Sequence, residues 1–466
     1  MSTGLSRLSA SVVRECSLAL RRLVAVFTVA AFTIAPMVAA AATPTARVRW
    51  TVNVGQPVYN TPRVRDGVVY LDTVQPSGPN VFAVKHGKIL WKFATGGAIT
   101  TPVTLSGSQL FVASDIGPTH YMRALDTKSG QLIWDYTRDQ PPECMCSHKT
   151  HYLQSVLIAQ TDGHSFYAFR PDGTIPSRRV WVFRGDGARL TAPVIVGDIV
   201  LFGSADDCLY ALNSETGKIR WRKKTGYSFT APPTVIGNMM VAGNRGGNIY
   251  AFAVGTGKTI WTAATNGPID TPPVVYRSKV FIAAGAGDRG IYALSVSTGR
   301  QLWYHQMADY TNYAPVILDK TLIVASRDGN AVGIDPDNGQ ILWTTDLHGM
   351  PFSRPVVDGN AVVIKVGDHR LVKIRAKTGR VLWSYHTASV ITSPVVESRQ
   401  STGTTASTPA TVYIGTSTGK VLALEGTPGQ TALKGRNTAT VSGSDYSGDL
   451  TGDWFGLRSS PNISSV

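Results

Sequence analysis

The chain carries a tryptophan about every 40 residues, and most of these tryptophans close the same short phrase. The phrase is Gly-Lys-Ile-Leu-Trp at residues 87–91 and returns as Gly-Lys-Ile-Arg-Trp at residues 217–221. Successive tryptophans of the series are 43, 47, 40, 40, 42, 40 and 40 residues apart. A fixed period of this length indicates supersecondary units that bury their apolar faces only against their neighbours. The chain is therefore predicted to be a repeat array, whose function lies in the residues that depart from the repeat.

Each repeat is predicted to contain four short strands. Residues 191–221 show four apolar segments, separated by turns rich in Asp, Asn, Ser and Gly. Proline opens the first segment, as in Ala192-Pro193-Val194, where a strand does not need the missing N–H. Four antiparallel strands per repeat, arranged radially, make a β-propeller blade, and helical periodicity is nearly absent after residue 42.

The two ends of the array are predicted to complete one blade together. The last repeat supplies strands near residues 392–396, 411–416 and 420–424, but no tryptophan strand follows. The missing strand is predicted at residues 47–52, and its pairing would remove exposed sheet edges. Counted this way the array has nine units. The tryptophans are predicted to pack between neighbouring blades, and they are Trp50, Trp91, Trp134, Trp181, Trp221, Trp261, Trp303, Trp343 and Trp383.

The array spans residues 47–425, and the segments on either side of it differ from it in composition. Residues 1–42 combine four arginines with an apolar run that ends in small residues, which is typical of a secretory signal peptide. The alternative is an uncleaved transmembrane anchor, because about 20 apolar residues can span a bilayer. Residues 426–466 are rich in Gly, Ser and Thr and are predicted to be disordered. The mature protein is expected to be exported to the periplasm.

The exported part of the chain is basic. Removing residues 1–42 leaves 41 Lys and Arg against 29 Asp and Glu, a net charge of +12. This charge favours anionic partners such as an envelope polymer, although scattered Lys and Arg also serve solubility alone. Nucleic acid is not an expected partner, because no recognition motif is present.

The repeat Leu-Tyr-Ala-Leu-Asn-Ser-Glu-Thr-Gly-Lys-Ile-Arg-Trp at residues 209–221 resembles the PQQ-type propeller repeats of two protein groups. These are the quinoprotein dehydrogenases and the BamB-type outer-membrane assembly factors. The resemblance implies eight blades, one fewer than the repeat count. It also implies either a scaffold that binds an envelope protein or a dehydrogenase with pyrroloquinoline quinone and Ca²⁺. The chain has neither adjacent cysteines nor a Cys-x-x-Cys-His motif, so we expect a non-enzymatic, monomeric scaffold without a cofactor.

The longest interval between tryptophans contains the densest cluster of reactive side chains. Cys144, Cys146, His148 and His151 could bind a metal such as Zn²⁺ or copper, although their spacing matches no specific zinc pattern. Cys208 is expected on a loop of the next repeat, between its second and third strands. An oxidising compartment would favour a disulfide from Cys208 to Cys144 or Cys146. The sequence thus leaves three interpretations of these residues: a metal site, a disulfide, or no special role.

The end of the chain contains a short aromatic motif. Residues 448–458 resemble the opening phrase of carbohydrate-selective outer-membrane porins, with a departure at Phe455. One interpretation is a disordered terminus that carries no function. The other is that Trp454, Phe455 and Leu457 contact a partner, which would associate the protein with the outer membrane.

Overall fold

The structure is a computed structural model that describes residues 44–99, 102–116, 119–138, 149–153, 156–161, 164–170, 179–185, 188–392, 394–397 and 411–425. The chain divides into two units, residues 1–42 and 43–466, and every described residue belongs to the second unit. The expected signal peptide and the tail from residue 426 lie outside the described residues.

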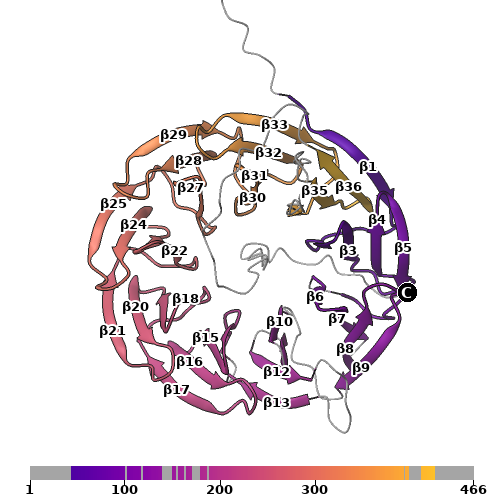
Figure 1. Ribbon diagram of the computed structural model, residues 1–466, viewed down its shortest axis with the longest axis horizontal. Helices are drawn as coiled ribbons and strands as arrows, with labels where there is room; N and C mark the ends of the chain where they lie inside the picture. The colour runs from indigo at the N-terminus through magenta and orange to yellow at the C-terminus, as the bar shows by residue number, and fades with distance from the viewer. Residues whose placement is uncertain are drawn as a thin grey trace, which may run out of the picture. The chain divides into compact units, whose positions relative to one another are not determined.

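The described residues form nine antiparallel sheets of four strands each, set around a common centre (Figure 1). Each sheet is a propeller blade, and we number the blades from the sheet that begins at β2. Blades 1 to 3 are β2 (Arg63–Arg65), β3 (Val68–Asp72), β4 (Val81–Lys85) and β5 (Lys88–Phe93); β6 (Thr104–Ser106), β7 (Gln109–Ile116), β8 (Thr119–Asp126) and β9 (Leu132–Arg138); and β10 (Lys149–Leu153), β11 (Val156–Thr161), β12 (Ser165–Phe169) and β13 (Arg179–Arg184). Blades 4 to 6 are β14 (Val194–Val196), β15 (Ile199–Gly203), β16 (Cys208–Asn213) and β17 (Ile219–Lys224); β18 (Thr234–Ile236), β19 (Met239–Gly243), β20 (Asn248–Ala253) and β21 (Thr259–Ala264); and β22 (Val274–Tyr276), β23 (Lys279–Ala283), β24 (Gly290–Ser295) and β25 (Gln301–Gln306). Blades 7 to 9 are β26 (Val316–Leu318), β27 (Thr321–Ala325), β28 (Asn330–Ile334) and β29 (Ile341–Asp346); β30 (Val356–Asp358), β31 (Ala361–Val366), β32 (Arg370–Arg375) and β33 (Val381–His386); and β34 (Val395–Glu397), β35 (Thr411–Gly415), β36 (Lys420–Glu425) and β1 (Arg47–Asn53).

The all-β propeller architecture predicted from the sequence is confirmed, and the described part of the chain has nine blades. The expectation of eight, which came from the family resemblance, is wrong. The repeat count was correct because blade 3 is a complete sheet, although its first strand, β10, lacks the proline that opens the first strand of other repeats.

Blade 9 is built from both ends of the array, as predicted. Strand β1 pairs antiparallel with β36, and Trp50 lies opposite Ala423. Val58 and Leu71 of the first repeat share a hydrophobic cluster with Tyr413 of blade 9. The ends of the array therefore contact each other through a sheet and through a core.

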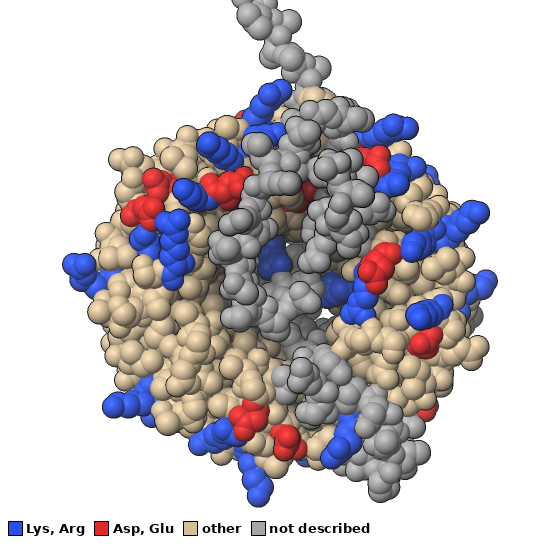
Figure 2. Space-filling view, in the orientation of Figure 1, with Lys and Arg blue, Asp and Glu red and all other residues tan. Residues whose placement is uncertain are grey.

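Charged side chains are spread around the rim of the face shown in Figure 2, outside the atoms drawn grey. Lys and Arg are mixed there with Asp and Glu instead of gathering in one patch, and further basic side chains are visible in the central opening. The basic net charge of the chain is therefore distributed on this face, as its scattered positions in the sequence suggested.

The tryptophan and the glycine of the repeated phrase are partners between neighbouring blades. Gly379 of blade 8 has a φ of 69°, and a Cβ on it would come within 2.5 Å of the Trp343 ring of blade 7. The same close approach joins Gly217 to Trp181 and Gly257 to Trp221. Glycine is required at this turn both for its backbone conformation and for the contact with the indole.

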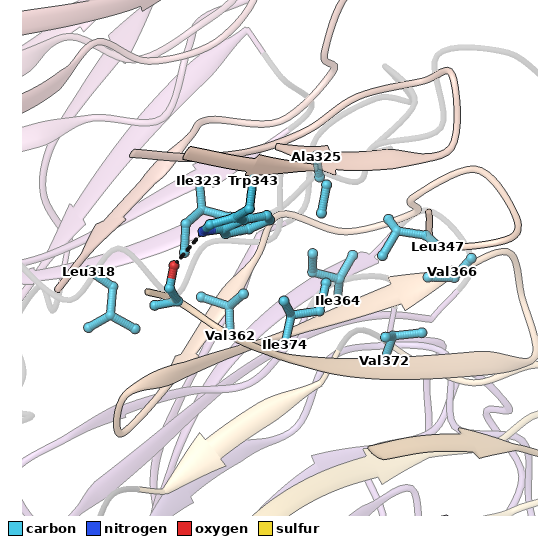
Figure 3. Packing of buried hydrophobic residues seen from close by; sticks show 12 residues of the cluster. Leu318, Ile323, Ala325, Trp343, Leu347, Val362, Ile364, Val366, Val372 and Ile374 are labelled. Atoms are coloured by element: carbon cyan, nitrogen blue, oxygen red, sulfur yellow. Dashed lines mark hydrogen bonds between the residues drawn. The ribbon is translucent and has the colours of Figure 1, made fainter. Parts of the chain in front are cut away.

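Each of these indoles also donates a hydrogen bond to the next blade. Trp343 Nε1 donates to the Ala376 carbonyl at 2.9 Å, and the ring packs on Val362, Ile374 and their neighbours in blade 8 (Figure 3). Equivalent bonds join Trp221 to the Val254 carbonyl and others of the series to the corresponding turn. The repeated phrase therefore specifies both the packing and the orientation of successive blades.

Trp383 departs from this pattern because the next blade contains the chain ends. Blade 9 has no turn between β36 and β1, and the buried Trp383 Nε1 has no hydrogen-bond partner. Residues 44–46 lie along β33 instead, where the Ala46 N–H donates to the Ser384 carbonyl at 3.1 Å. They leave Leu382 only 9% exposed, whereas Leu342 at the same position of blade 7 is 49% exposed. Residues 44–46 thus cover β33 of blade 8, in the place of the turn that blade 9 lacks.

Candidate functional site

The two faces of the propeller differ in how much they vary between blades. Connections within an antiparallel blade alternate between its two ends. The turns after the first and third strands therefore lie on one face, which we call the turn face. The turns after the second strand and the connections between blades lie on the opposite face, which we call the entry face.

On blades 2 and 4 to 8, the turn face repeats one backbone design. Two residues join the first and second strands of most blades, such as Gly197 and Asp198 in blade 4. In blades 2 and 4 to 8, the turn before the outer strand is fixed by a bond from the glycine N–H to the carbonyl four residues earlier, as from Gly217 to Asn213 at 2.8 Å. Turns that are this uniform are explained by the requirements of folding, and they do not indicate a binding site.

The entry face varies from blade to blade. The turn between β3 and β4 spans residues 73–80, whereas the turn between β15 and β16 spans residues 204–207. Exposed large apolar side chains on the connections between blades include Tyr59, Tyr227 and Met350. Aromatic residues, Met and Arg are the types enriched at protein interfaces. The entry face is therefore the candidate functional surface.

Tyr227 is the best-supported anchor on this face. It lies between β17 and β18, is 54% exposed, and one face of its ring lies against the backbone of Gly246, where a Cβ would be 2.3 Å away. Arg245 beside it forms an ion pair with Asp270 at 3.3 Å. Because its ring is already held in place by packing, Tyr227 would lose little conformational entropy on binding. Tyrosine and arginine are also residue types that are enriched in interface hot spots.

A buried carboxylate underlies the entry face at blade 1. Asp72 ends β3, at a position where blades 4 and 5 have Gly203 and Gly243, and it is 1% exposed. Its oxygens accept hydrogen bonds from Asn60 Nδ2 and, at 3.1 Å, from the Val103 N–H. Burial raises the pKa of Asp72 from 3.8 to about 7, in spite of these bonds.

This carboxyl predicts an unusual pH dependence of stability. The pKa is about 7 in the folded state and near 3.8 in the unfolded state, so between these values the folded protein binds more protons. The contribution of Asp72 to the free energy of unfolding should fall as pH rises from 4 to 7, by up to about 1.4 kcal/mol per pH unit. Urea unfolding of wild type and Asp72→Asn across this range isolates the effect as their difference. A difference that is flat or rises with pH would contradict the assignment.

Cys208 is placed differently from the sequence-based expectation. It is the first residue of β16, not part of a loop, and it is fully buried. Arg222 Nε donates to its Sγ at 3.2 Å, and its own N–H donates to Asp206 Oδ1 at 3.1 Å. Burial raises the pKa of the thiol. Asp206 also accepts from Tyr210 and from Arg222, so the group forms a hydrogen-bonded network at the rim of blade 4.

The other members of the predicted cysteine and histidine cluster cannot be placed in the same way. Cys144, Cys146 and His148 lie outside the described residues, and His151 is described only as part of the backbone of β10. Metal binding by these four residues and a disulfide to Cys208 stay predictions. Elsewhere in the described part of the chain, no three His, Cys, Asp or Glu are grouped to hold a metal ion. No helix among the described residues is long and apolar enough to cross a membrane.

The fold and its repeats define a β-propeller of PQQ-like repeats. The family model described as outer membrane protein assembly factor BamB matches residues 74–175, 167–267, 237–340 and 311–455. The chain belongs to this family. No curated protein sequence matches it.

Solved structures agree with the fold at low sequence identity. BamB from Moraxella catarrhalis is 16% identical, with a TM-score of 0.51 over 82% of this chain and 100% of that chain. The computationally designed Ika8 protein is 18% identical, with a TM-score of 0.53 over 71% and 96% of the respective chains. A quinohemoprotein alcohol dehydrogenase from Pseudomonas putida is 14% identical, with a TM-score of 0.51 over 84% and 78%. These likenesses concern the fold, which an outer membrane protein assembly factor shares with an alcohol dehydrogenase.

Proposed function

We propose that the protein is a non-enzymatic scaffold of the periplasm that binds an envelope protein through its entry face. The observation that carries this proposal is the contrast between the faces, because the turn face repeats one design in blades 2 and 4 to 8 while the entry face presents Tyr59, Tyr227 and Met350. Membership of the BamB family supports an envelope location and a role beside outer-membrane proteins. The basic charge of the mature chain would help it approach an anionic envelope surface.

The scaffold is proposed to act as a monomer, with its blades held together by the tryptophan packing. The tail beyond residue 425 is an additional candidate for contact with the outer membrane, through Trp454, Phe455 and Leu457. A quinone-dependent dehydrogenase is the alternative function. Adding pyrroloquinoline quinone and Ca²⁺ to the pure protein should give no bound chromophore and no dye reduction if the scaffold proposal is correct.

Affinity purification from the native envelope tests the proposal, with variants that separate the faces. Tyr227→Ala should reduce the recovered partner about tenfold or more, because truncating an interface hot spot costs about 2 kcal/mol or more. Leu342→Ala is the matched control, since Leu342 is similarly exposed but lies on an outer strand. Equal recovery with both variants, or a loss only with Leu342→Ala, would contradict binding through the entry face.

A further inference from the structure

Blade 8 departs from the other repeats through basic side chains on the entry face. The fifth residue of its second strand is Lys365, where blades 4 and 5 have Gly203 and Gly243. The turn that follows contains His369 and leads into Arg370, the first residue of β32. His369 and Arg370 border a hollow of about 270 Å³ that is also lined by His348, Gly349, Val366, Gly367, Asp368 and His386.

One buried hydrogen-bond donor at the hollow lacks an acceptor among the described residues. Arg370 lies directly opposite His386 in the pairing of β32 with β33, so two donor side chains are neighbours. Nη2 of Arg370 is buried and has no hydrogen-bond partner. At the rim of blade 4, by contrast, Arg222 Nη2 donates to Asp206 at 3.1 Å. In blade 8, no carboxylate of a described residue accompanies Arg370 in the way that Asp206 accompanies Arg222.

The acidic residues near the hollow are already engaged. Asp368 forms an ion pair with Lys365 at 3.2 Å, and the Lys365 side chain is only 12% exposed. Asp346 contacts His348 Nδ1 at 2.9 Å and accepts from the His348 N–H at 2.6 Å. Neither carboxylate forms an ion pair with Arg370. Among the described residues, none supplies an acceptor for Nη2 of Arg370.

The walls of the hollow are held in place by the backbone. The Gly367 N–H donates to the Met350 carbonyl at 2.8 Å, and the Ile391 N–H donates to the Asp368 carbonyl at 2.8 Å. The Thr387 N–H donates to the His369 carbonyl at 3.0 Å. A site fixed in this way pays little entropy when a ligand binds.

We propose that this hollow binds a phosphate group, either as free phosphate or as the phosphate monoester of a larger molecule. A guanidinium binds phosphate through charge-assisted, often bidentate hydrogen bonds. Imidazoles from three separate segments, at positions 348, 369 and 386, line the same hollow as the guanidinium. Donors from several directions suit a tetrahedral oxyanion better than a planar carboxylate. A metal ion is a poorer fit, because the histidines here do not converge as a ligand group. The inference is independent of whether the entry face binds a protein.

Titration calorimetry of the purified protein in a phosphate-free buffer of low ionic strength tests this site. Inorganic phosphate or glycerol phosphate should bind saturably at one site, and acetate should bind more weakly. Arg370→Gln should weaken phosphate binding about tenfold or more, because a hydrogen bond to a charged group is lost. Arg222→Gln is the matched control, since that guanidinium already has Asp206 as its partner, and it should leave binding unchanged. Sedimentation with phosphatidic acid vesicles, compared with phosphatidylcholine vesicles, shows whether the source is a lipid headgroup.

Several results would overturn the proposal. They are the absence of saturable binding for every phosphate probe, an equal affinity for phosphate in wild type and Arg370→Gln, and binding of acetate as tight as that of phosphate. A thermal unfolding midpoint measured for each variant confirms that it is folded. His386→Gln provides a second variant, and it should weaken binding several-fold if the proposal is correct.

Discussion

Replacing Lys373 with alanine is expected to lower the free energy of unfolding by about 3 to 5 kcal/mol, because it removes one partner of a buried ion pair. Lys373 Nζ lies 2.6 Å from Asp358 Oδ2, and their side chains are 11% and 3% exposed. Burial raises the pKa of Asp358, and the Lys373 ammonium opposes that rise. Without Lys373 the carboxylate loses its compensation, so the variant should regain stability relative to wild type as pH is lowered and Asp358 is protonated.

The other blades show which residues a control variant should carry at positions 358 and 373. Lys373 lies opposite Trp383, where other blades have a small residue such as Ala211 opposite Trp221. Asp358 takes the place of Val196 in blade 4. The double variant Asp358→Val with Lys373→Ala gives blade 8 the pattern of its neighbours and should unfold within about 1 kcal/mol of wild type. Chemical denaturation measures both, and a double variant as unstable as Lys373→Ala alone would contradict this account of the pair.

Replacing Trp343 with alanine should also cost about 3 to 5 kcal/mol, because a large buried ring between blades 7 and 8 would be lost. The milder change Trp343→Phe tests the hydrogen bond separately. It leaves the Ala376 carbonyl without its donor and should cost about 1 to 3 kcal/mol.

Trp383→Phe is the matched control, since Trp383 is 1% exposed but its Nε1 has no partner. Its cost should be smaller than that of Trp343→Phe by about 1 kcal/mol or more. Denaturant unfolding of the two variants gives this comparison directly. Equal costs would mean that the indole hydrogen bonds do not contribute to the packing of blades.

Much of the fold could be predicted from the sequence because each blade repeats the same local chemistry. The phrase that ends in Trp221 carries its strand, its turn glycine and its inter-blade contact within a few residues. The pairing of β1 with β36 could be predicted because a missing strand and an unused strand stood at opposite ends. The family resemblance gave the wrong number of blades, since that number depends on how many repeats the chain contains.

The candidate sites were harder to predict because they depend on register between strands. Asp358 and Lys373 belong to β30 and β32, which are separated by β31, so their spacing in the sequence does not suggest a pair. Alignment of the repeats would have shown a lysine where other blades have alanine or glycine. The hollow at Arg370 also brings together three segments, from two connections and one strand. Cys208, which the sequence placed in a loop, is buried because β16 begins at that residue.

Photo-crosslinking in intact cells tests whether the entry face carries the function. A photoreactive phenylalanine analogue would be placed at Tyr227 on the entry face and, as a control, at Glu215 on the turn face. Both positions are exposed and lie close in sequence on opposite faces of the array. The account predicts a discrete adduct with one envelope protein from position 227 and none from position 215. Adducts from position 215 alone, or identical adducts from both positions, would contradict it.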